Sequence, residues 1–86
     1  MLLEVGRIDR AHGLGGDVVV TLVSNHLDRL DVGSRLEAEG RWLEVARARP
    51  AKHRFVVHFV GVDTPEQATE LAGTVLRGEA VEDDPD

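Results

Sequence analysis

The 86-residue sequence predicts an all-β fold: a small, closed, six-stranded antiparallel barrel with one short helix before the last strand. Valine and leucine cluster in short runs that glycine and proline separate, which is the spacing of short strands. Aromatic residues are few, two Phe and one Trp, so the predicted core is aliphatic. Closure into a barrel removes the exposed strand edges that would otherwise favour aggregation.

The strands are separated by turns of recognisable chemistry. A glycine-rich link at residues 13–16 joins the first two strands, and Glu39-Gly40 forms a hairpin turn because glycine accepts the positive φ of tight hairpins. Residues 50–52, which begin with Pro50, turn the chain between the fourth and fifth strands. The strands are expected at residues 3–10, 17–23, 34–39, 41–49, 53–60 and 74–77.

One helix is expected between the fifth and sixth strands. Asp63 or Thr64 caps its start, Pro65 suits the first helical position, and Glu66 or Gln67 closes a capping box. A left-handed glycine ends the helix. The 3.6-residue period places three side chains on one face. They are Ala68, Leu71 and Ala72, and the terminating glycine is Gly73.

Alternation within residues 53–60 separates an inner from an outer face. The inward side chains are expected to be Phe55, Val57 and Phe59, and the outward ones Val56, His58 and Val60. Outward valines indicate a surface that the helix or another domain covers. Trp42 has the opposite parity to Leu43 and Val45, so it lies near the surface or plugs one end of the barrel.

The net charge of −6 is unevenly distributed. Residues 1–56 are close to neutral, whereas residues 57–86 carry one Arg against eight acids. We therefore expect residues 1–78 to form one barrel domain and residues 79–86 to form a solvated acidic linker. Net charge by itself neither supports nor excludes a nucleic-acid partner.

Several functional classes lack their required residues. Without cysteine there is no disulfide, thiolate nucleophile or cysteine-based zinc site. No apolar run approaches the roughly 20 residues of a membrane span, and the N-terminus has no signal-peptide pattern. No histidine pair has helical metal spacing, so neither a metal nor another cofactor is expected. These features fit a cytoplasmic protein that is not an enzyme.

The segment 11–17, Ala-His-Gly-Leu-Gly-Gly-Asp, is the most distinctive motif. A phosphate-binding loop requires a following helix, whereas a valine-rich strand follows here, so the glycines are interpreted as a tight corner between strands. His12 with Asp9 or Asp17 suggests an acid–base pair, but no nucleophile accompanies them. A histidine that pins the loop by hydrogen bonding is the preferred interpretation.

A second motif is a run of cations without an intervening acid. It contains Arg47, Arg49, Lys52 and Arg54, which the predicted register places at the tip of a hairpin. Mutual repulsion at one tip favours a phosphate partner, although a solvated tip is an equally simple explanation. Among aromatic residues only Phe55 lies nearby, so base stacking on single strands is poorly supported.

Two segments resemble the N-terminal domain of the RimM family of ribosome maturation factors. Residues 5–18, Val-Gly-Arg-Ile-Asp-Arg-Ala-His-Gly-Leu-Gly-Gly-Asp-Val, are similar to the opening motif of that family. Residues 59–63, Phe-Val-Gly-Val-Asp, followed by Ala68 and Leu71-Ala-Gly73, are similar to a second motif. The resemblance covers residues 4–78. It implies a barrel similar to one in translation elongation factors, followed beyond residue 86 by a PRC-type barrel.

The resemblance also implies a function. RimM proteins assist maturation of the head of the small (30S) ribosomal subunit and processing of 16S rRNA, and they bind the free subunit. Small-subunit ribosomal protein nineteen is the implied protein partner, mainly through the second barrel. A monomer is expected. The motif residues that would contact the ribosome are His12, Gly13, Leu14 and Gly16.

One departure from the family concerns charge. The family usually has a basic residue where this sequence has Gly15, so rRNA contacts would have to come from other cations, including Arg7 and Arg10. Two other functions stay open. One is a generic nucleic-acid-binding small barrel, and the other is a fragment of a flavin-binding enzyme, which only the barrel class suggests.

Overall fold

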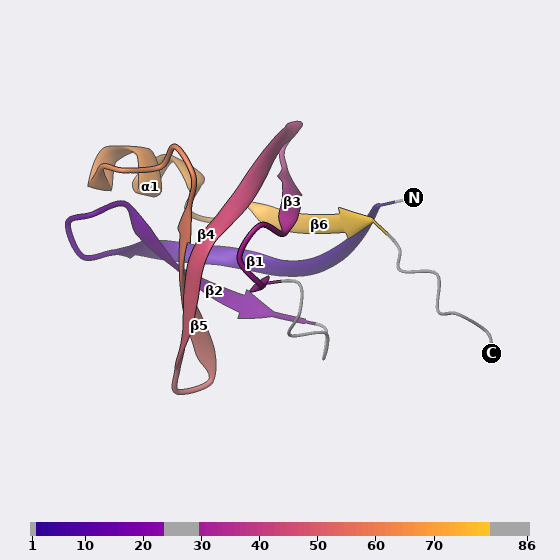
Figure 1. The fold of residues 1–86 in the computed structure, drawn as a ribbon, viewed down its shortest axis with the longest axis horizontal. Helices are drawn as coiled ribbons and strands as arrows, with labels where there is room; N and C mark the ends of the chain where they lie inside the picture. Colours follow the sequence, from indigo (N-terminus) through magenta and orange to yellow (C-terminus); the bar gives the residue numbers. More distant parts are fainter. Residues whose placement is uncertain (1, 24–29, 80–86) are drawn as a thin grey trace.

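The computed structural model describes residues 2–23 and 30–79. Within these ranges the chain forms a closed six-stranded barrel with one helix before the last strand, as the sequence predicts (Figure 1). Residues 24–29, between the second and third expected strands, and residues 80–86 of the expected linker lie outside the described residues. The elements are β1 (Leu2–His12), β2 (Asp17–Leu22), β3 (Arg35–Ala38), β4 (Arg41–Ala51), β5 (Arg54–Phe59), α1 (Pro65–Leu71) and β6 (Val75–Glu79).

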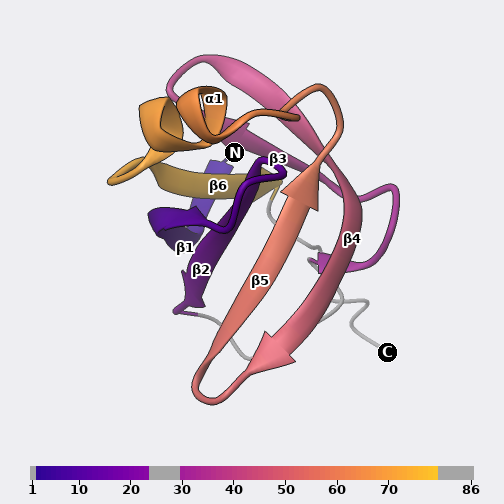
Figure 2. The same ribbon diagram turned by 90° about the vertical axis from the view of Figure 1, so that its left-hand side faces the viewer.

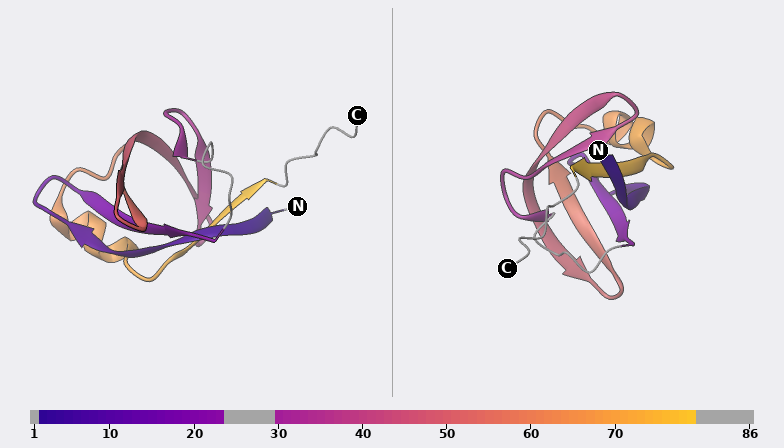
Figure 3. Two further views of the ribbon diagram at one scale, coloured as in Figure 1. Left: turned by 90° about the horizontal axis from the view of Figure 1, so that it is seen from below. Right: turned by 90° about the vertical axis from the view of Figure 1, so that its right-hand side faces the viewer.

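The strands are antiparallel and follow the order β1-β2-β5-β4-β3-β6 around the barrel (Figures 2 and 3). The barrel closes because β6 pairs with both β1 and β3. Both long strands carry irregularities, two in β1 (between Glu4 and Gly6 and between Ile8 and Arg10) and one in β4 between Val45 and Arg47. Such bulges increase the local twist, which lets one strand curve between two neighbours.

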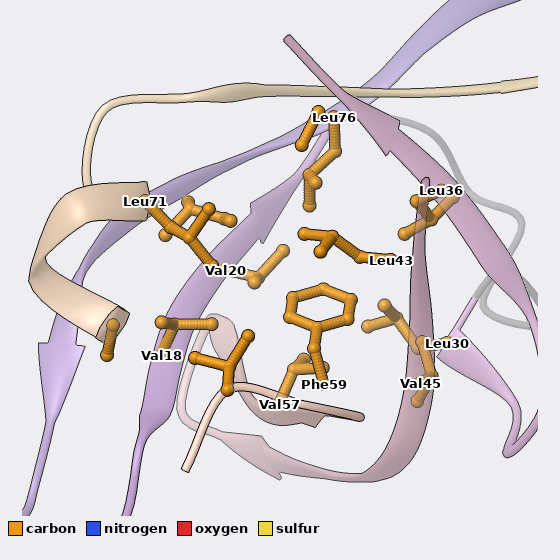
Figure 4. Packing of buried hydrophobic residues seen from close by; sticks show 14 of the residues in the cluster. Val18, Val20, Leu30, Leu36, Leu43, Val45, Val57, Phe59, Leu71 and Leu76 are labelled. Atoms are coloured by element: carbon orange, nitrogen blue, oxygen red, sulfur yellow. The ribbon is translucent and has the colours of Figure 1, made fainter. Parts of the chain in front are cut away.

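The barrel interior is filled by aliphatic side chains around a single aromatic ring. Phe59 lies at the centre, close to Val57 and Leu43, and has no exposed surface (Figure 4). Ala68 and Leu71 of α1 belong to the same core, so the helix covers part of the barrel rather than standing free. No helix in the described ranges is long and apolar enough to cross a membrane.

The helix begins as predicted and ends one residue earlier than expected. Thr64 is the N-cap, its hydroxyl accepts from the backbone N–H of Gln67, and the Gln67 side chain completes the capping box. Gly73 has the predicted left-handed φ of 84°. The prediction for Ala72 is wrong: its backbone turns extended at the C-cap, so its side chain leaves the helical face and is exposed.

The structure confirms one of the two predicted hairpin turns and corrects the position of the other. Glu39 and Gly40 both have positive φ, which confirms the first turn. The second turn was misplaced, because Pro50 lies within β4 opposite Phe55 and the reversal occurs at residues 52–53, where Lys52 has a φ of 59°. Because proline has no N–H, Pro50 donates no hydrogen bond to the neighbouring strand, and β4 nevertheless continues to Ala51.

The alternation of inward and outward side chains along β5 is mostly as predicted. Val57 and Phe59 are buried inside the barrel, and Phe55 is partly buried. Val56 points outward, yet it is only 4% exposed. Val56 borders two hollows that side chains of its own sheet and of the β4–β5 turn line. The second outward valine, Val60, is 55% exposed, so no described residue covers it as the prediction expected. Trp42 is 48% exposed on β4, which supports the surface position and excludes the barrel plug.

The corner between β1 and β2 depends on two glycines of different character. Gly13 and Gly16 have φ values of 73° and 88°, which confirms their predicted role in a tight corner. A Cβ at Gly13 would meet nothing within 4 Å. A Cβ at Gly16 would lie 2.3 Å from the carbonyl oxygen of Val62 and 2.8 Å from the backbone of Asp63. Gly16 is therefore needed both for its conformation and for close packing.

We predict that alanine substitutions rank these glycines by stability. Gly16→Ala should lower the free energy of unfolding by about 3 kcal/mol or more, because left-handed strain adds to a backbone clash. Gly13→Ala should cost about 1 kcal/mol from strain alone. Gly15→Ala, which has open space and no positive φ, is the matched control. Urea unfolding followed by Trp42 fluorescence measures all three, and equal losses at positions 13 and 16 would contradict the packing argument.

Candidate functional site

Six cationic side chains lie together on the outer surface of β1, β5, β4 and the β4–β5 turn. Their positions follow from strand alternation, since Val18 and Val20 of β2 and Val57 of β5 point inward. Figure 2 shows β2, β5 and β4 side by side. We call this surface the basic face. Its cations are Arg7, Arg10, Arg47, Arg49, Lys52 and Arg54, which are all exposed.

Cross-strand pairing arranges the basic face in rows. One row runs across four strands as Arg10, Val19, Val56 and Arg49, because each is the register partner of the next. Directly paired residues on one face have Cβ atoms roughly 5 Å apart. The row therefore has two valines at its centre and an arginine at each end.

The cations lie further apart than the prediction that they share one hairpin tip implied. Only Lys52 lies in the turn itself, with Arg54 next to it, whereas Arg47 and Arg49 lie further back along β4. The run contains no acid in the sequence, but β1 and β2 supply two carboxylates from outside it. The prediction of one repulsive tip is therefore wrong, and the charges spread over a sheet face.

Asp9 holds two of the arginines. Its carboxylate lies 3.6 Å from Nε of Arg7 and 3.6 Å from Nε of Arg54, and it accepts the Thr21 hydroxyl. The Asp9 side chain is only 16% exposed, whereas both arginines are more than half exposed. The carboxylate thus anchors the guanidinium groups while leaving them open to solvent.

Asp17 connects the basic face to the segment before α1 through His58. Its Oδ1 lies 2.8 Å from Nδ1 of His58 and 3.9 Å from Nη2 of Arg47. The other ring nitrogen of His58, Nε2, lies 3.1 Å from Oδ1 of Asp63. His58 thus ties β2, β5 and the helix start together.

The predicted loop residues surround one end of the basic face. The side chain of His12 forms no hydrogen bond with any described residue, so the loop-pinning role expected for it is wrong, and the histidine that bridges two segments is His58. Gly13 and Gly16 shape the corner, and Leu14 projects from it with 87% of its surface exposed. Ribosome contact by these four residues stays a prediction.

A hollow of about 490 Å³ opens on the basic face. Its lining combines valine and alanine side chains with cations and imidazoles from β1 and from the β4–β5 hairpin. A smaller hollow of about 60 Å³ lies beside it, and Val56 borders both. The larger hollow is lined by Arg10, His12, Val19, Ala51, Lys52, His53, Arg54 and Val56.

The arrangement is suited to binding anions. The six cations outnumber the two carboxylates that touch them by four, and Arg10, Arg49 and Lys52 form no ion pair with a described residue. Guanidinium groups pair with phosphate through two hydrogen bonds. Among residues 2–23 and 30–79, no three His, Asp or Glu side chains are grouped to hold a metal ion.

Sequence reasoning found the cations but missed the residues that organise them. Asp9 and Asp17 were considered only as partners of His12, and His58 only as an outward residue. Val19 was assigned no role. Their proximity depends on the pairing of β2 with β5, for which the local sequence contains no signal.

Comparisons with known proteins agree on one family. Residues 3–80 match the family model of the RimM N-terminal domain. A ribosome maturation factor RimM of Cutibacterium acnes is 45% identical over 86 residues, which cover 95% of this chain and 48% of that protein. The same factor of Acidothermus cellulolyticus is 39% identical over 82 residues, which cover 93% and 47%. The chain therefore spans about half the length of these curated relatives.

Two solved structures share the fold. A putative 16S ribosomal RNA processing protein RimM of Pseudomonas aeruginosa matches with a TM-score of 0.80, covering 99% of this chain and 52% of that one. The N-terminal domain of RimM from Thermus thermophilus matches with a TM-score of 0.79, covering 98% and 95%. Both are 24% identical to this chain, so the likeness concerns the fold alone.

We predict that His58 is coupled more strongly to Asp17 than to Asp63. The Asp17 contact is shorter and its carboxylate is 23% exposed, against 71% for Asp63, so solvent screens it less. Double-mutant cycles with alanine, measured by urea unfolding, should give a coupling of about 1 kcal/mol for the first pair and less than about 0.5 kcal/mol for the second. The reverse order would contradict the assignment of Asp17 as the main partner.

Proposed function

Because the chain belongs to the RimM family of ribosome maturation factors, we propose that it is a binding domain that takes part in assembly of the small ribosomal subunit. It binds the free 30S subunit in the cytoplasm, as a monomer without cofactor, and contacts 16S rRNA. Through this contact it assists maturation of the subunit head and rRNA processing. It performs no catalysis.

The basic face is the observation that carries this proposal. The whole chain has a net charge of −6, yet six cations from β1, β4, β5 and the β4–β5 turn converge on one surface. Successive outward residues of a strand, such as Arg47 and Arg49, are roughly 7 Å apart, which suits neighbouring phosphates of one RNA strand. Phosphate contacts of this kind supply sequence-independent affinity through counterion release.

The mechanism follows from differential affinity. A factor that binds an immature conformation of the head more tightly than the mature one shifts the population toward states that still need it, and it dissociates when folding removes the site. No covalent step is required. The described residues support this view, because both ring nitrogens of His58 already contact carboxylates, those of Asp17 and Asp63, and are not free to act on a substrate.

The protein partner belongs to a different surface. The curated relatives are about twice as long as this chain, so they contain a second part that this chain does not span. A cationic surface favours RNA over a basic protein, since like charges oppose association. We therefore assign small-subunit ribosomal protein nineteen mainly to that second part, and rRNA to the basic face.

We predict that the chain cosediments with purified free small subunits and binds assembled ribosomes much less. The binding constant should fall steeply with salt concentration. The double variant Arg10→Ala/Arg49→Ala should reduce the slope of the log–log plot by about 2, since each arginine accounts for one phosphate contact. Equal binding to free subunits and assembled ribosomes would contradict the proposal.

The matched control is Arg41→Ala. Arg41 is exposed at the opposite end of β4 from the β4–β5 turn and forms no ion pair with a described residue. Its loss removes one positive charge without touching the basic face, so the slope should stay the same. A generic nucleic-acid-binding barrel is the second candidate, because the basic face alone also fits it. Binding to an unrelated RNA as tightly as to the free subunit would favour that candidate.

A substitution that restores charge to the corner provides a further prediction. A side chain at Gly15 would meet no atom within 4 Å, and its φ is not positive, so the backbone accepts lysine there. Gly15→Lys should increase the affinity for free small subunits at low salt and steepen the salt dependence by about 1. Gly15→Gln is the uncharged control of similar length. No difference between the two variants would show that the corner lies away from the RNA.

A further inference from the structure

The larger hollow of the basic face has a composition that simple phosphate binding does not require. Its floor is Val19 and Val56, which point outward from the sheet although outward positions are usually polar. Ala51 extends this apolar lining toward the turn. The hollow measures about 490 Å³, which lies within the size range of ligand pockets, whereas a phosphate group alone needs far less space.

The rim of the hollow carries positive charge. Arg10 comes from β1, Lys52 from the turn and Arg54 from β5. Arg54 is held by Asp9, whereas Arg10 and Lys52 form no ion pair with a described residue. An anionic group that enters here gains contacts with cations that are not already neutralised.

Two imidazoles complete the rim. His12 lies at the end of β1, and His53 lies in the β4–β5 turn. Neither side chain forms a hydrogen bond with a described residue, so both rings are available. Unpaired RNA bases stack on planar side chains, including histidine and arginine. The shortage of Phe, Tyr and Trp on this surface therefore does not exclude stacking, because histidine supplies the aromatic plane.

We infer that this hollow holds one unpaired nucleotide of the bound RNA. The base or ribose contacts the apolar floor and an imidazole, and the phosphate lies among Arg10, Lys52 and Arg54. The inference rests on the proposed function and adds to it that the domain distinguishes RNA with an extruded nucleotide from a continuous duplex. A duplex backbone alone would use the cations but would leave the apolar floor unfilled.

The test compares two hairpin RNAs with the same stem. One carries a single bulged 2-aminopurine nucleotide, and the other is fully paired. Fluorescence anisotropy at one salt concentration should show at least about fivefold tighter binding of the bulged RNA by the 86-residue chain. The 2-aminopurine emission should be quenched on binding, because its base stacks in the hollow.

Two variants test how the hollow contributes to binding, separately from the contribution of the cations. Ala51→Leu fills the hollow without altering any charge, and His53→Ala removes a ring from an exposed turn, so that one variant remains informative if the other fails to fold. Each should reduce the preference for the bulged RNA to less than about twofold. Arg41→Ala should leave the preference unchanged, and circular dichroism confirms that each variant is folded.

The outcomes are distinguishable. Equal affinity for the two hairpins with no change in 2-aminopurine emission overturns the inference, and steep salt dependence in the same experiment would leave the proposed function intact. Absence of binding to both hairpins and to free small subunits overturns the proposed function together with the inference. A preference that persists in both variants places the unpaired nucleotide elsewhere and also overturns the inference.

Discussion

The pairing of β2 with β5 is the constraint on which the candidate site depends. Only three residue pairs form it, Val18 with Val57, Val19 with Val56 and Val20 with Phe55. They join the β1–β2 hairpin directly to the β4–β5 hairpin, whereas the other connection between these hairpins runs around the barrel through β6 and β3. Because side chains alternate with a period of two, a shift of one residue would turn a strand's buried side chains outward. The buried core thus fixes which valines lie on the basic face.

Two carboxylates turn a set of like charges into an ordered surface. Asp9 and Asp17 are largely shielded from solvent, and each contacts at least one exposed guanidinium. Surface ion pairs of this kind contribute little to stability. Their value lies in orientation, since a held arginine loses less conformational freedom when a phosphate arrives. The remaining cations stay uncommitted, which leaves the face a positive excess for an anionic partner.

The location of charge matters more than its total. A chain of net charge −6 would repel RNA if its charges were evenly mixed. Within the screening length of roughly 8 Å at physiological salt, however, an approaching phosphate responds mainly to the nearest side chains. Much of the acidic excess belongs to the sequence after residue 57, whereas the cations of the basic face fall between residues 7 and 54. A domain that is acidic overall can therefore still attract an anionic partner at a locally basic surface.

The sequence by itself determined the elements of this protein. Short valine and leucine runs, the Thr64–Pro65 helix start and the positive-φ glycines are local signals, because each depends on neighbours within a few residues. The tertiary structure alone decided where Pro50 lies, that Ala72 faces solvent and that His58 rather than His12 links two carboxylates. It also brought Arg7 and Arg54 to one carboxylate across 47 residues of sequence separation. Such contacts depend on strand register across the barrel, which is set by how the whole core packs and not by any segment alone.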